Sequence, residues 1–360
     1  MNNIILLSNR LFHYRVPIYN YFHQEFLKEG YNFSVLATEQ QPNFDPHFEF
    51  ECQIEPPSFS KYKAIIQEKQ PAAVIVFMHL KDRIMWPMVH WLKIQGIPVL
   101  YWNHGVNLQD PDNWYKNILY RYLHNLADAI VLYSPAEKQY IKTKNHPKVH
   151  IGYNTLNLHS FPTITQSKEE LKKEWKLPYK KVVLFAASTT FRRRLELLLE
   201  IFDGRTGEEL GLVLAGLRDI PTWVKEVVDR SPAITYVGEI PDQVAFNKLV
   251  KLSDVFTIPG RSGLAINQSF HWGVPYVTTN VRQSPEVWYL KDGQNGYIAD
   301  IEKEGDYRDK LLRVLQDDAL HAQMSAKAQE VIQTEGDIHN MYLGFWNAFQ
   351  FATERKKVKR

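Results

Sequence analysis

The sequence has one cysteine in 360 residues, Cys52, which excludes an internal disulfide and a thiolate metal cluster. It also lacks a strong excess of one charge: the formal net charge is +3, too small to indicate nucleic-acid binding. No apolar run approaches the roughly 20 residues of a membrane-spanning helix. The apolar start ends at Ser8, Asn9 and Arg10, which is unlike a signal peptide. These absences predict a cytoplasmic protein.

What is present is typical of a globular enzyme of two domains. Hydrophobic residues make up 44% of the chain and charged residues 23%, which are ordinary globular values. The length exceeds what one hydrophobic core usually fills, so we expect two domains. The local run of basic residues at 355–360 predicts either a solvated terminus or attraction to an anionic membrane face.

Short apolar segments alternate with helical patterns, the order expected of parallel sheets covered by helices on both faces. The first series fills residues 1–160 and the second residues 161–335, with a linker rich in Pro, Thr and Ser at 159–168. Residues 336–360 are expected to form a C-terminal helix and basic tail that pack back toward the N-terminal domain. We predict an α/β protein of two Rossmann-like, doubly wound parallel-sheet domains facing a central cleft, where strand carboxyl ends gather.

The individual elements are expected at the following residues. Strands are expected at 3–8, 33–37, 73–77, 99–102, 129–133, 181–186, 210–215, 234–237, 255–258 and 276–279. Helices are expected at 16–28, 61–68, 83–95, 118–126, 194–202, 222–228, 243–252, a segment ending at Phe270, 306–333 and 337–353.

The turn Pro259-Gly260-Arg261-Ser262-Gly263 lies between an expected strand and an expected helix. Its glycines let the backbone approach a ligand closely, and a helix N-terminus offers free N–H groups to a phosphate. Ser262 is a candidate N-cap of that helix. Taken alone, the turn is equally compatible with a structural loop that binds nothing.

The order of segments around this turn resembles the GT-B glycosyltransferases, most nearly the large retaining group called family 4. The resemblance covers residues 181–300 well and the N-terminal half loosely. It implies an N-terminal acceptor-binding domain and a C-terminal nucleotide-sugar-binding domain. The segments that carry it are 253–259, Gly263-Leu264, 273–279, 183–187 followed by Arg193, 154–157, 214–216, 236–238, Pro285-Glu286 and 293–297.

One departure from the family pattern concerns donor recognition. The family commonly has two glutamates where this chain has Gly260 and Gln268. Gln268 can hydrogen-bond a ribose hydroxyl but carries no charge, and Gly260 can supply only its backbone. Asn267, Ser269 and His271 are candidates to substitute, or they belong to a helix surface. The donor-binding residues implied by the resemblance are Ser188, Gly260, Arg261, Ser262, Gly263, Leu264 and Gln268.

Three consecutive arginines, Arg192 to Arg194, follow another expected strand. Guanidinium groups bind phosphate oxygens in bidentate fashion and stabilise charge that grows on a leaving diphosphate. The resemblance points to Arg193 as a catalytic residue and leaves Arg192 and Arg194 as solvated side chains. Ser188 lies where the family often has a cation, and Arg261 is the candidate to replace it.

His104 follows an expected strand of the N-terminal half and precedes Gly105, which permits a tight turn. It resembles the family position whose histidine lies near the donor sugar. The resemblance implies a catalytic or sugar-orienting role, a hydrogen bond to the sugar or its oxocarbenium-like transition state. The alternative is a structural histidine. No protein nucleophile is assigned.

The N-terminal domain is expected to bind the acceptor. Arg10, Tyr14 and Arg15 follow the first expected strand and are candidate contacts for an anionic acceptor such as a lipid diphosphate, or else parts of a polar loop. The apolar stripe at 84–91 rests on a membrane in one interpretation and is part of the core in the other.

Asp110-Pro111-Asp112 is interpreted as the start of a helix capped by Asp112, and a metal site is the less favoured alternative. We therefore expect no cofactor and no metal, with the nucleotide-sugar as co-substrate. The resemblance implies a retaining, metal-independent hexosyltransferase acting on a glycan or lipid-linked acceptor in lipopolysaccharide, capsule or exopolysaccharide synthesis. The alternatives are a nucleotide-sugar epimerase of the same fold and a catalytically silent nucleotide-sugar-binding subunit.

Overall fold

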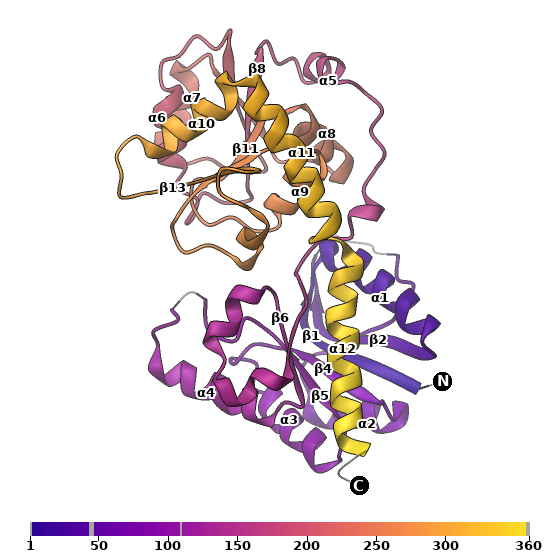
Figure 1. Cartoon of the computed structure of the whole chain (residues 1–360). Helices are drawn as coiled ribbons and strands as arrows, with labels where there is room; N and C mark the ends of the chain where they lie inside the picture. Colours follow the sequence, from indigo (N-terminus) through magenta and orange to yellow (C-terminus); the bar gives the residue numbers. More distant parts are fainter. Residues whose placement is uncertain (1, 43–46, 109, 358–360) are drawn as a thin grey trace. The chain divides into compact units, whose positions relative to one another are not determined.

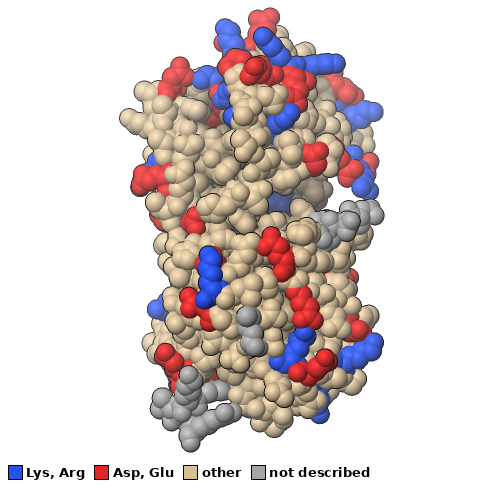
Figure 2. Space-filling model, turned by 90° about the vertical axis from the view of Figure 1, so that its right-hand side faces the viewer, with Lys and Arg blue, Asp and Glu red and all other residues tan. Residues whose placement is uncertain are grey.

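The computed structural model describes residues 2–42, 47–108 and 110–357, with side chains to residue 355. The chain divides into two compact units (Figure 1). Unit 1 consists of Met1–Asn157 together with Ile338–Arg360, and unit 2 consists of Leu158–Asp337. The last residues of the basic run at 355–360 lie outside the described residues. Basic and acidic side chains are mixed over the face drawn in Figure 2, as the small net charge predicts.

Unit 1 is built on a seven-stranded, entirely parallel sheet in the order β3-β2-β1-β4-β5-β6-β7. The strand order reverses direction between β1 and β4, so the loops that follow these two strands diverge to opposite faces. The strands are β1 (Asn2–Leu11), β2 (Tyr31–Gln40), β3 (Glu51–Ile54), β4 (Ala73–Phe77), β5 (Val99–Trp102), β6 (Ala129–Leu132) and β7 (Val149–Ile151).

Helices cover both faces of this sheet, each over its own apolar core. One core lies under α1 and α12, and the other under α2, α3 and α4. The helices are α1 (Val16–Lys28), α2 (Phe59–Lys69), α3 (Met85–Ile94), α4 (Trp114–Leu126) and α12 (Ile338–Lys357), with short 3-10 helices η1 (His13–Arg15), η2 (Pro135–Tyr140) and η3 (Thr143–Lys148).

The C-terminal helix α12 is part of the core of unit 1, although it is far from the other elements in sequence (Figure 1). Its buried residues recur at helical spacing and form one stripe: Ile338, Met341, Tyr342, Phe345, Ala348, Phe349 and Ala352. Phe345 packs against Phe22 of α1 and Trp102 of β5, with ring centroids 4.9 Å apart in both pairs. Gly344 allows close approach, since a Cβ there would lie 2.1 Å from the carbonyl oxygen of Ile151.

Unit 2 contains a six-stranded parallel sheet in the order β10-β9-β8-β11-β12-β13, which reverses direction between β8 and β11. The strands are β8 (Lys181–Ala186), β9 (Leu210–Ala215), β10 (Ile234–Gly238), β11 (Val255–Thr257), β12 (Tyr276–Thr279) and β13 (Gly296–Ala299). The helices are α5 (Lys168–Glu174), α6 (Leu195–Phe202), α7 (Thr222–Arg230), α8 (Gln243–Leu252), α9 (Ala265–His271), α10 (Asp306–Gln316) and α11 (Asp318–Thr334), with 3-10 helices η4 (Leu158–Ser160) and η5 (Pro285–Tyr289).

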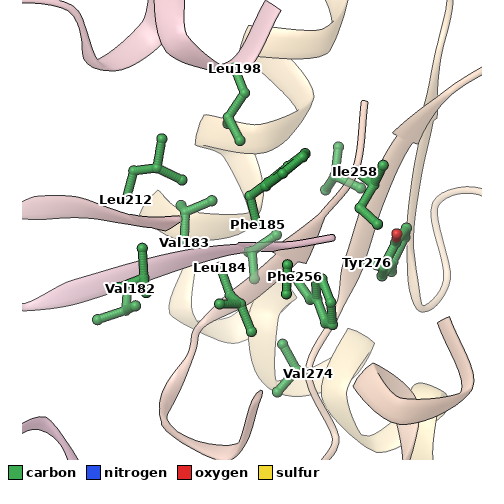
Figure 3. Packing of buried hydrophobic residues seen from close by; sticks show 14 of the residues in the cluster. Val182, Val183, Leu184, Phe185, Leu198, Leu212, Phe256, Ile258, Val274 and Tyr276 are labelled. Carbon is green, nitrogen blue, oxygen red and sulfur yellow. The ribbon is translucent and has the colours of Figure 1, made fainter. Parts of the chain in front are cut away.

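The core of unit 2 forms on both faces of β8 (Figure 3). Successive residues of this strand point to opposite faces. Val183 and Phe185 share a side with Leu198 of α6, whereas Leu184 points to the side of Val274. All of these side chains are buried, so β8 and its neighbour β11 are a rigid base for the loops that follow them.

The predicted α/β fold of two doubly wound parallel sheets is confirmed, and α1, β4, β5, β8, β9, α8 and β12 have the expected bounds. Three short strands, β3, β7 and β13, were not expected, because a strand of three or four residues has too few positions to show a periodicity. Helix α5 starts inside the expected linker, where Ser167 and Glu170 form a capping box.

Two other expectations are wrong at helix ends. The helix expected at 306–333 is two helices, because Asp317 ends α10 and its side chain accepts the amide of Leu320 to cap α11. The N-cap of α4 is Asn113, which accepts the amide of Lys116 at 3.0 Å, and not Asp112. Pro87 lies in the first turn of α3, where no backbone N–H is needed.

Candidate active site

The predicted donor residues of unit 2 lie on two loops at the point where the strand order reverses. The loop 187–194 follows β8, and the loop 258–264 follows the neighbouring strand β11. Backbone hydrogen bonds join the loops: the amide of Gly260 donates to the carbonyl of Arg193 at 2.7 Å, and that of Arg261 to the carbonyl of Arg192 at 2.9 Å. Ligands of open α/β sheets bind beyond this edge.

Gly260 is required by this contact between the loops. A Cβ at this position would lie 2.2 Å from the carbonyl oxygen of Arg192 and 2.5 Å from the carbonyl carbon of Arg193, both backbone atoms. The absence of a glutamate here therefore has a packing reason. The amide of Gly260 is also engaged by Arg193, so its assignment as a donor contact stays a prediction.

Gln283 organises the same turn and was missed in the sequence. Its Oε1 accepts the amide of Ser262 at 2.8 Å, and its Nε2 donates to the carbonyl of Gly260 at 3.0 Å. It also lies within hydrogen-bond distance of the Thr278 hydroxyl and the Thr279 carbonyl, both at 2.9 Å. One amide side chain thus ties the turn to the end of β12. A lone glutamine 21 residues after Ser262 gives no sequence signal of this role.

Ser262 is buried, and the prediction that it caps α9 is wrong. The N-cap of α9 is Leu264, which makes no side-chain capping hydrogen bond. The Ser262 hydroxyl instead accepts from the Tyr276 hydroxyl at 3.1 Å and lies 3.3 Å from that of Thr278. These two contacts hold Ser262, and with it the turn, against β12.

Arg193 is half-buried beside this turn. Its Nη1 donates to the carbonyl oxygen of Arg261, and its buried Nε has no hydrogen-bond partner within the described part of the chain. Burial lowers the pKa of Arg193, because the protein supplies little to compensate for lost hydration. A buried N–H without a partner is costly, and a ligand oxygen would satisfy it.

Arg261 lies in the same cluster of positive charge. Burial lowers its pKa, and the carboxylate of Glu286 offsets this only in part. Neighbouring guanidinium groups lower it further: Arg192, Arg193 and Arg282. Four arginines share this end of the sheet with one buried glutamate nearby, so the site has an excess of positive charge that favours an anion.

The flanking residues occupy different environments. Arg194 pairs with Glu196 at 2.7 Å on the surface, and Ser188 is exposed. The three other predicted donor contacts are partly exposed: Gly263, Leu264 and Gln268.

Two proposed substitutes for the missing glutamates are engaged elsewhere. The Ser269 hydroxyl donates to the carbonyl of Val274 at 2.7 Å, and the ring of His271 packs between Phe161 and Trp272 at 5.0 Å from each. Asn267 is fully buried.

In unit 1, His104 lies just beyond the carboxyl end of β5. Gly105 has a φ of +71°, the left-handed conformation that the tight turn needs, and its amide donates to the Asn103 side chain. The Nδ1 of His104 lies 2.7 Å from Oε1 of Glu137, and its ring packs on Tyr133 with a centroid distance of 4.0 Å. Glu137, which is buried, was missed in the sequence because it lies 33 residues away.

Arg15 is held in an aromatic cage. Its guanidinium carbon lies 4.7 Å from the ring of Trp102 and 5.3 Å from those of Tyr14 and Phe77. Nη1 donates to the Asn154 side chain at 3.2 Å, whereas none of the residues that the structure describes accepts a hydrogen bond from the buried Nε. Burial lowers the pKa of Arg15, but nearby phenol groups, foremost that of Tyr14, raise it above the usual value.

The other predicted acceptor contacts lie close by. Arg10 does not follow β1 but belongs to it, because β1 and β2 continue to Leu11 and Gln40 and place Arg10 opposite Glu39. The two form an exposed ion pair at 3.6 Å. Tyr14 is partly exposed and stacks on Phe12 at 5.6 Å. Arg15 and Tyr14 thus come together at the end of β1, whereas Arg10 points to the neighbouring strand.

A pocket of about 470 Å³ lies elsewhere in unit 2, between α6 and the loop that joins β13 to α10. Leu197 and Glu200 line one side, and Asp300, Lys303 and Arg308 are among the residues of the other. None of the predicted donor residues lines it.

Within the described residues, no group of three or more His, Cys, Asp or Glu side chains is placed to hold a metal ion. In the same part of the chain, none of the helices combines the length and the apolar character needed to cross a membrane.

Comparisons with known proteins agree with this arrangement. A family model described as glycosyl transferases group 1 matches residues 180–317, and one described as Glycosyltransferase Family 4 matches residues 19–160, so that both units are represented. This chain belongs to the GT-B glycosyltransferases. The two-domain fold and the transferase class predicted from the sequence are thereby confirmed.

Solved structures similar to this glycosyltransferase share its fold over nearly the whole chain. Sucrose-phosphate synthase from Thermosynechococcus elongatus has a TM-score of 0.75 at 14% identity, covering 97% of this chain and 98% of that one. HepE from Anabaena in complex with UDP has a TM-score of 0.73 at 11% identity, covering 97% and 100%. WaaG, a glycosyltransferase involved in lipopolysaccharide biosynthesis, has a TM-score of 0.65 at 13% identity, covering 98% and 99%. No curated protein sequence matches the chain.

Proposed function

We propose that this glycosyltransferase moves a hexose from a UDP-sugar to a glycan or lipid-linked acceptor, with retention of configuration and without a metal ion, in the assembly of a surface polysaccharide. The observation that carries the donor assignment is the cluster of four arginines at the reversal of the strand order in unit 2. UDP is the first nucleotide to test, because the structurally similar HepE is seen with UDP.

The arginine cluster suits a leaving diphosphate. Reaction breaks the bond between the anomeric carbon and the β-phosphate oxygen, so negative charge grows on that phosphate. The unpartnered Nε of Arg193 and the neighbouring Arg261 offer donors there. The lowered pKa of each arginine reflects burial that nearby negative charge does not fully offset, and a diphosphate would supply further negative charge.

Independence from metal follows from the same charges. A divalent cation and a group of guanidinium groups can do the same task, which is to neutralise the leaving phosphate in a site that excludes water. We expect EDTA to leave the rate unchanged, and strict dependence on manganese would contradict this part of the proposal.

Unit 1 is proposed to supply the groups that contact the sugar and the acceptor. His104 is the proposed contact of the transferred sugar. Tyr14, Arg10 and the caged Arg15 lie near the end of β1, where an anionic acceptor such as a lipid diphosphate would be bound. Retention of configuration is proposed from the likeness to family 4, and a surface-polysaccharide role from the same likeness and from the fold shared with WaaG.

Peripheral contact with an anionic membrane is proposed through α4 and not through the stripe at 84–91. Ile84, Met85 and Met88 are buried in the core of unit 1, as the core interpretation of this stripe predicts. Helix α4 instead exposes apolar side chains together with Lys116 and Arg121 and contains no acidic residue. Its exposed large residues are Trp114, Tyr115, Ile118 and Tyr122. Aromatic and basic side chains together are typical of helices that lie on anionic membranes.

The donor is identified by a thermal-shift screen of the full chain against UDP, GDP, ADP, CMP and dTDP, because a ligand of the folded state raises the apparent stability. UDP is expected to give the largest shift. A larger shift with another diphosphate would redirect the donor assignment, and no shift with any of them would overturn it.

The role of Arg193 is tested by Arg193→Ala, which should lower kcat roughly 100-fold or more because a donor to the leaving group is lost. The matched control is Arg205→Ala. Arg205 is exposed in the loop between α6 and β9, at the amino ends of the strands and so opposite to the arginine cluster. This variant should keep the full rate. Full activity of the Arg193 variant with an identified donor and acceptor would sink the proposed role of the cluster.

A further inference from the structure

We infer that Glu137 is a positioning residue for His104: it fixes the neutral imidazole in the tautomer that carries its proton on Nδ1, so that Nε2 accepts a hydrogen bond from a hydroxyl of the transferred sugar. The inference rests on the proposed function, in which His104 contacts the transferred sugar. It adds Glu137 to the site and states that the sugar hydroxyl donates the hydrogen bond to His104.

Glu137 is itself held rigidly. Its side chain is only 4% exposed. Its Oε2 accepts two backbone amides at the end of β6, from Tyr133 at 2.7 Å and from Ser134 at 3.2 Å. These bonds occupy one oxygen and leave Oε1 facing Nδ1 of His104 at 2.7 Å.

The tautomer follows from the chemistry of the two partners. A carboxylate has no proton to donate, so Nδ1 must be the donor of the short contact with Glu137. In a neutral imidazole the other ring nitrogen then carries a lone pair and accepts. The ring is also fixed by packing against Tyr133, with ring centroids 4.0 Å apart, and a third of the side chain remains exposed to meet a ligand. A sugar hydroxyl is a donor that matches this nitrogen.

The substitution Glu137→Gln tests the inference with almost no change of shape. Only the amide oxygen of glutamine can accept the backbone N–H groups of Tyr133 and Ser134, so its NH₂ group must face His104. Nδ1 then has to accept, and the proton moves to Nε2. The substitution therefore reverses the tautomer and removes the acceptor that the sugar hydroxyl needs.

The readouts are the tautomer and the rate, both on the full chain. Long-range ¹H–¹⁵N NMR spectra, with the His104 signals assigned from their loss in His104→Gln, should show the Nδ1–H form in the wild type and the Nε2–H form in Glu137→Gln. With donor and acceptor saturating, kcat should fall at least about tenfold. The midpoint of unfolding in urea should stay near that of the wild type, which a merely structural loss would not allow.

Asp128→Asn is the matched control. Asp128 also accepts a backbone amide, from Val99 at 2.9 Å, and pairs with Lys93 at 2.5 Å, but it lies at the amino end of β6, away from His104. It should keep full activity. A wild-type His104 in the Nε2–H form, or a Glu137→Gln enzyme within twofold of the wild-type rate, would overturn the inference; the first of these does not depend on the folding of Glu137→Gln.

Two further outcomes distinguish a failure of this inference from a failure of the proposed function on which it rests. If His104→Gln loses activity while Glu137→Gln does not, the role of His104 stands and that of Glu137 fails. If His104→Gln transfers sugar at the full rate, the proposed contact of His104 with the sugar fails, and the inference about Glu137 fails with it.

Discussion

At the scale of single residues, Gly260 lies in a turn that packing constrains and where nucleotide binding is proposed. Gly260→Ala would drive a Cβ into the backbone of Arg192 and Arg193, which cannot rotate away as a side chain can. We expect the free energy of unfolding to fall by about 1–3 kcal/mol, as is usual for overpacking. The two loops must also separate, so calorimetry should show weaker nucleotide binding.

Gly263→Ala is the control for stability. A Cβ at Gly263 would have no atom nearer than the Ser284 hydroxyl oxygen at 4.0 Å. Its free energy of unfolding should stay within about 0.5 kcal/mol of the wild type. Equal stability of the two variants would show that the loops adjust to a side chain at Gly260 and would refute the packing argument.

His124 gives unit 1 a dependence on pH. It is 1% exposed, and neither ring nitrogen has a hydrogen-bond partner among the described residues. Its pKa is lowered from 6.5 to about 3, chiefly by burial and also by the positive charges of Lys148 and Arg121. Since the folded pKa is the lower one, the unfolded chain binds the proton more readily. The stability from a neutral His124 is complete above pH 6.5 and is lost as pH falls toward 3.

The measurement compares the wild type with His124→Leu, whose side chain suits the apolar surroundings. Between pH 7 and pH 5 the wild type should lose about 2 kcal/mol more of unfolding free energy than the variant. Urea titrations at the two pH values give both numbers. Parallel pH dependence of the two proteins would exclude His124 as the source.

The same scale shows what a sequence can reveal about a site. Arg193, Gly260 and His104 lie on loops that follow strands and match segments of the family pattern, so the sequence marks them. Gln283 and Glu137 do not, because each acts on a partner 20 or more residues away through a contact that exists only in the folded chain. Supporting residues of this kind are found from geometry.

At the scale of elements, α3 and α4 show where a hydrophobic pattern is ambiguous. Both helices contain tryptophan and a long apolar stretch, and for α3 the sequence favoured a core helix and left membrane contact as the alternative. The structure buries α3 between β5 and its neighbours and leaves Trp114 and Ile118 of α4 exposed at 72% and 49%. Which stripe faces solvent depends on the packing of the whole sheet, which periodicity alone does not encode.

The exposed face of α4 leads to a test by vesicle flotation. The double variant Trp114→Ser with Ile118→Ser should bind vesicles of phosphatidylglycerol and phosphatidylcholine several-fold more weakly than the wild type, because apolar area that would enter the interface is lost. The control is Trp223→Ser, which changes a 43% exposed tryptophan on α7 of unit 2. Wild-type protein that stays with the unbound fraction, or a double variant that floats equally well, would contradict the proposed surface.

At the scale of the whole molecule, the chain passes between the units twice, at Asn157 and again at Asp337. The alternation of strands and helices was enough to predict two doubly wound sheets, because a buried parallel sheet leaves a strong apolar signal in each strand. The packing of the last helix, α12, in unit 1 depends on a different signal, the apolar stripe along that helix. That stripe matches the aromatic surface of α1 and β2, where Tyr31 packs on Phe349 at 4.8 Å.

This connectivity predicts that the two units differ in their dependence on the C-terminus. Removing residues 338–360 would take seven buried side chains of the described part of α12 out of the core of unit 1. Two are alanines, and burial of each of the five larger ones is worth about 1.5–3 kcal/mol. That loss is comparable to the roughly 5–15 kcal/mol that usually holds a domain together. A fragment of residues 1–157 should therefore be unfolded by circular dichroism. A fragment of residues 158–337 is continuous and has its own core. It should unfold cooperatively and retain a thermal shift with UDP. A stably folded 1–157 fragment would show that the strands and helices before residue 158 bury enough surface without α12.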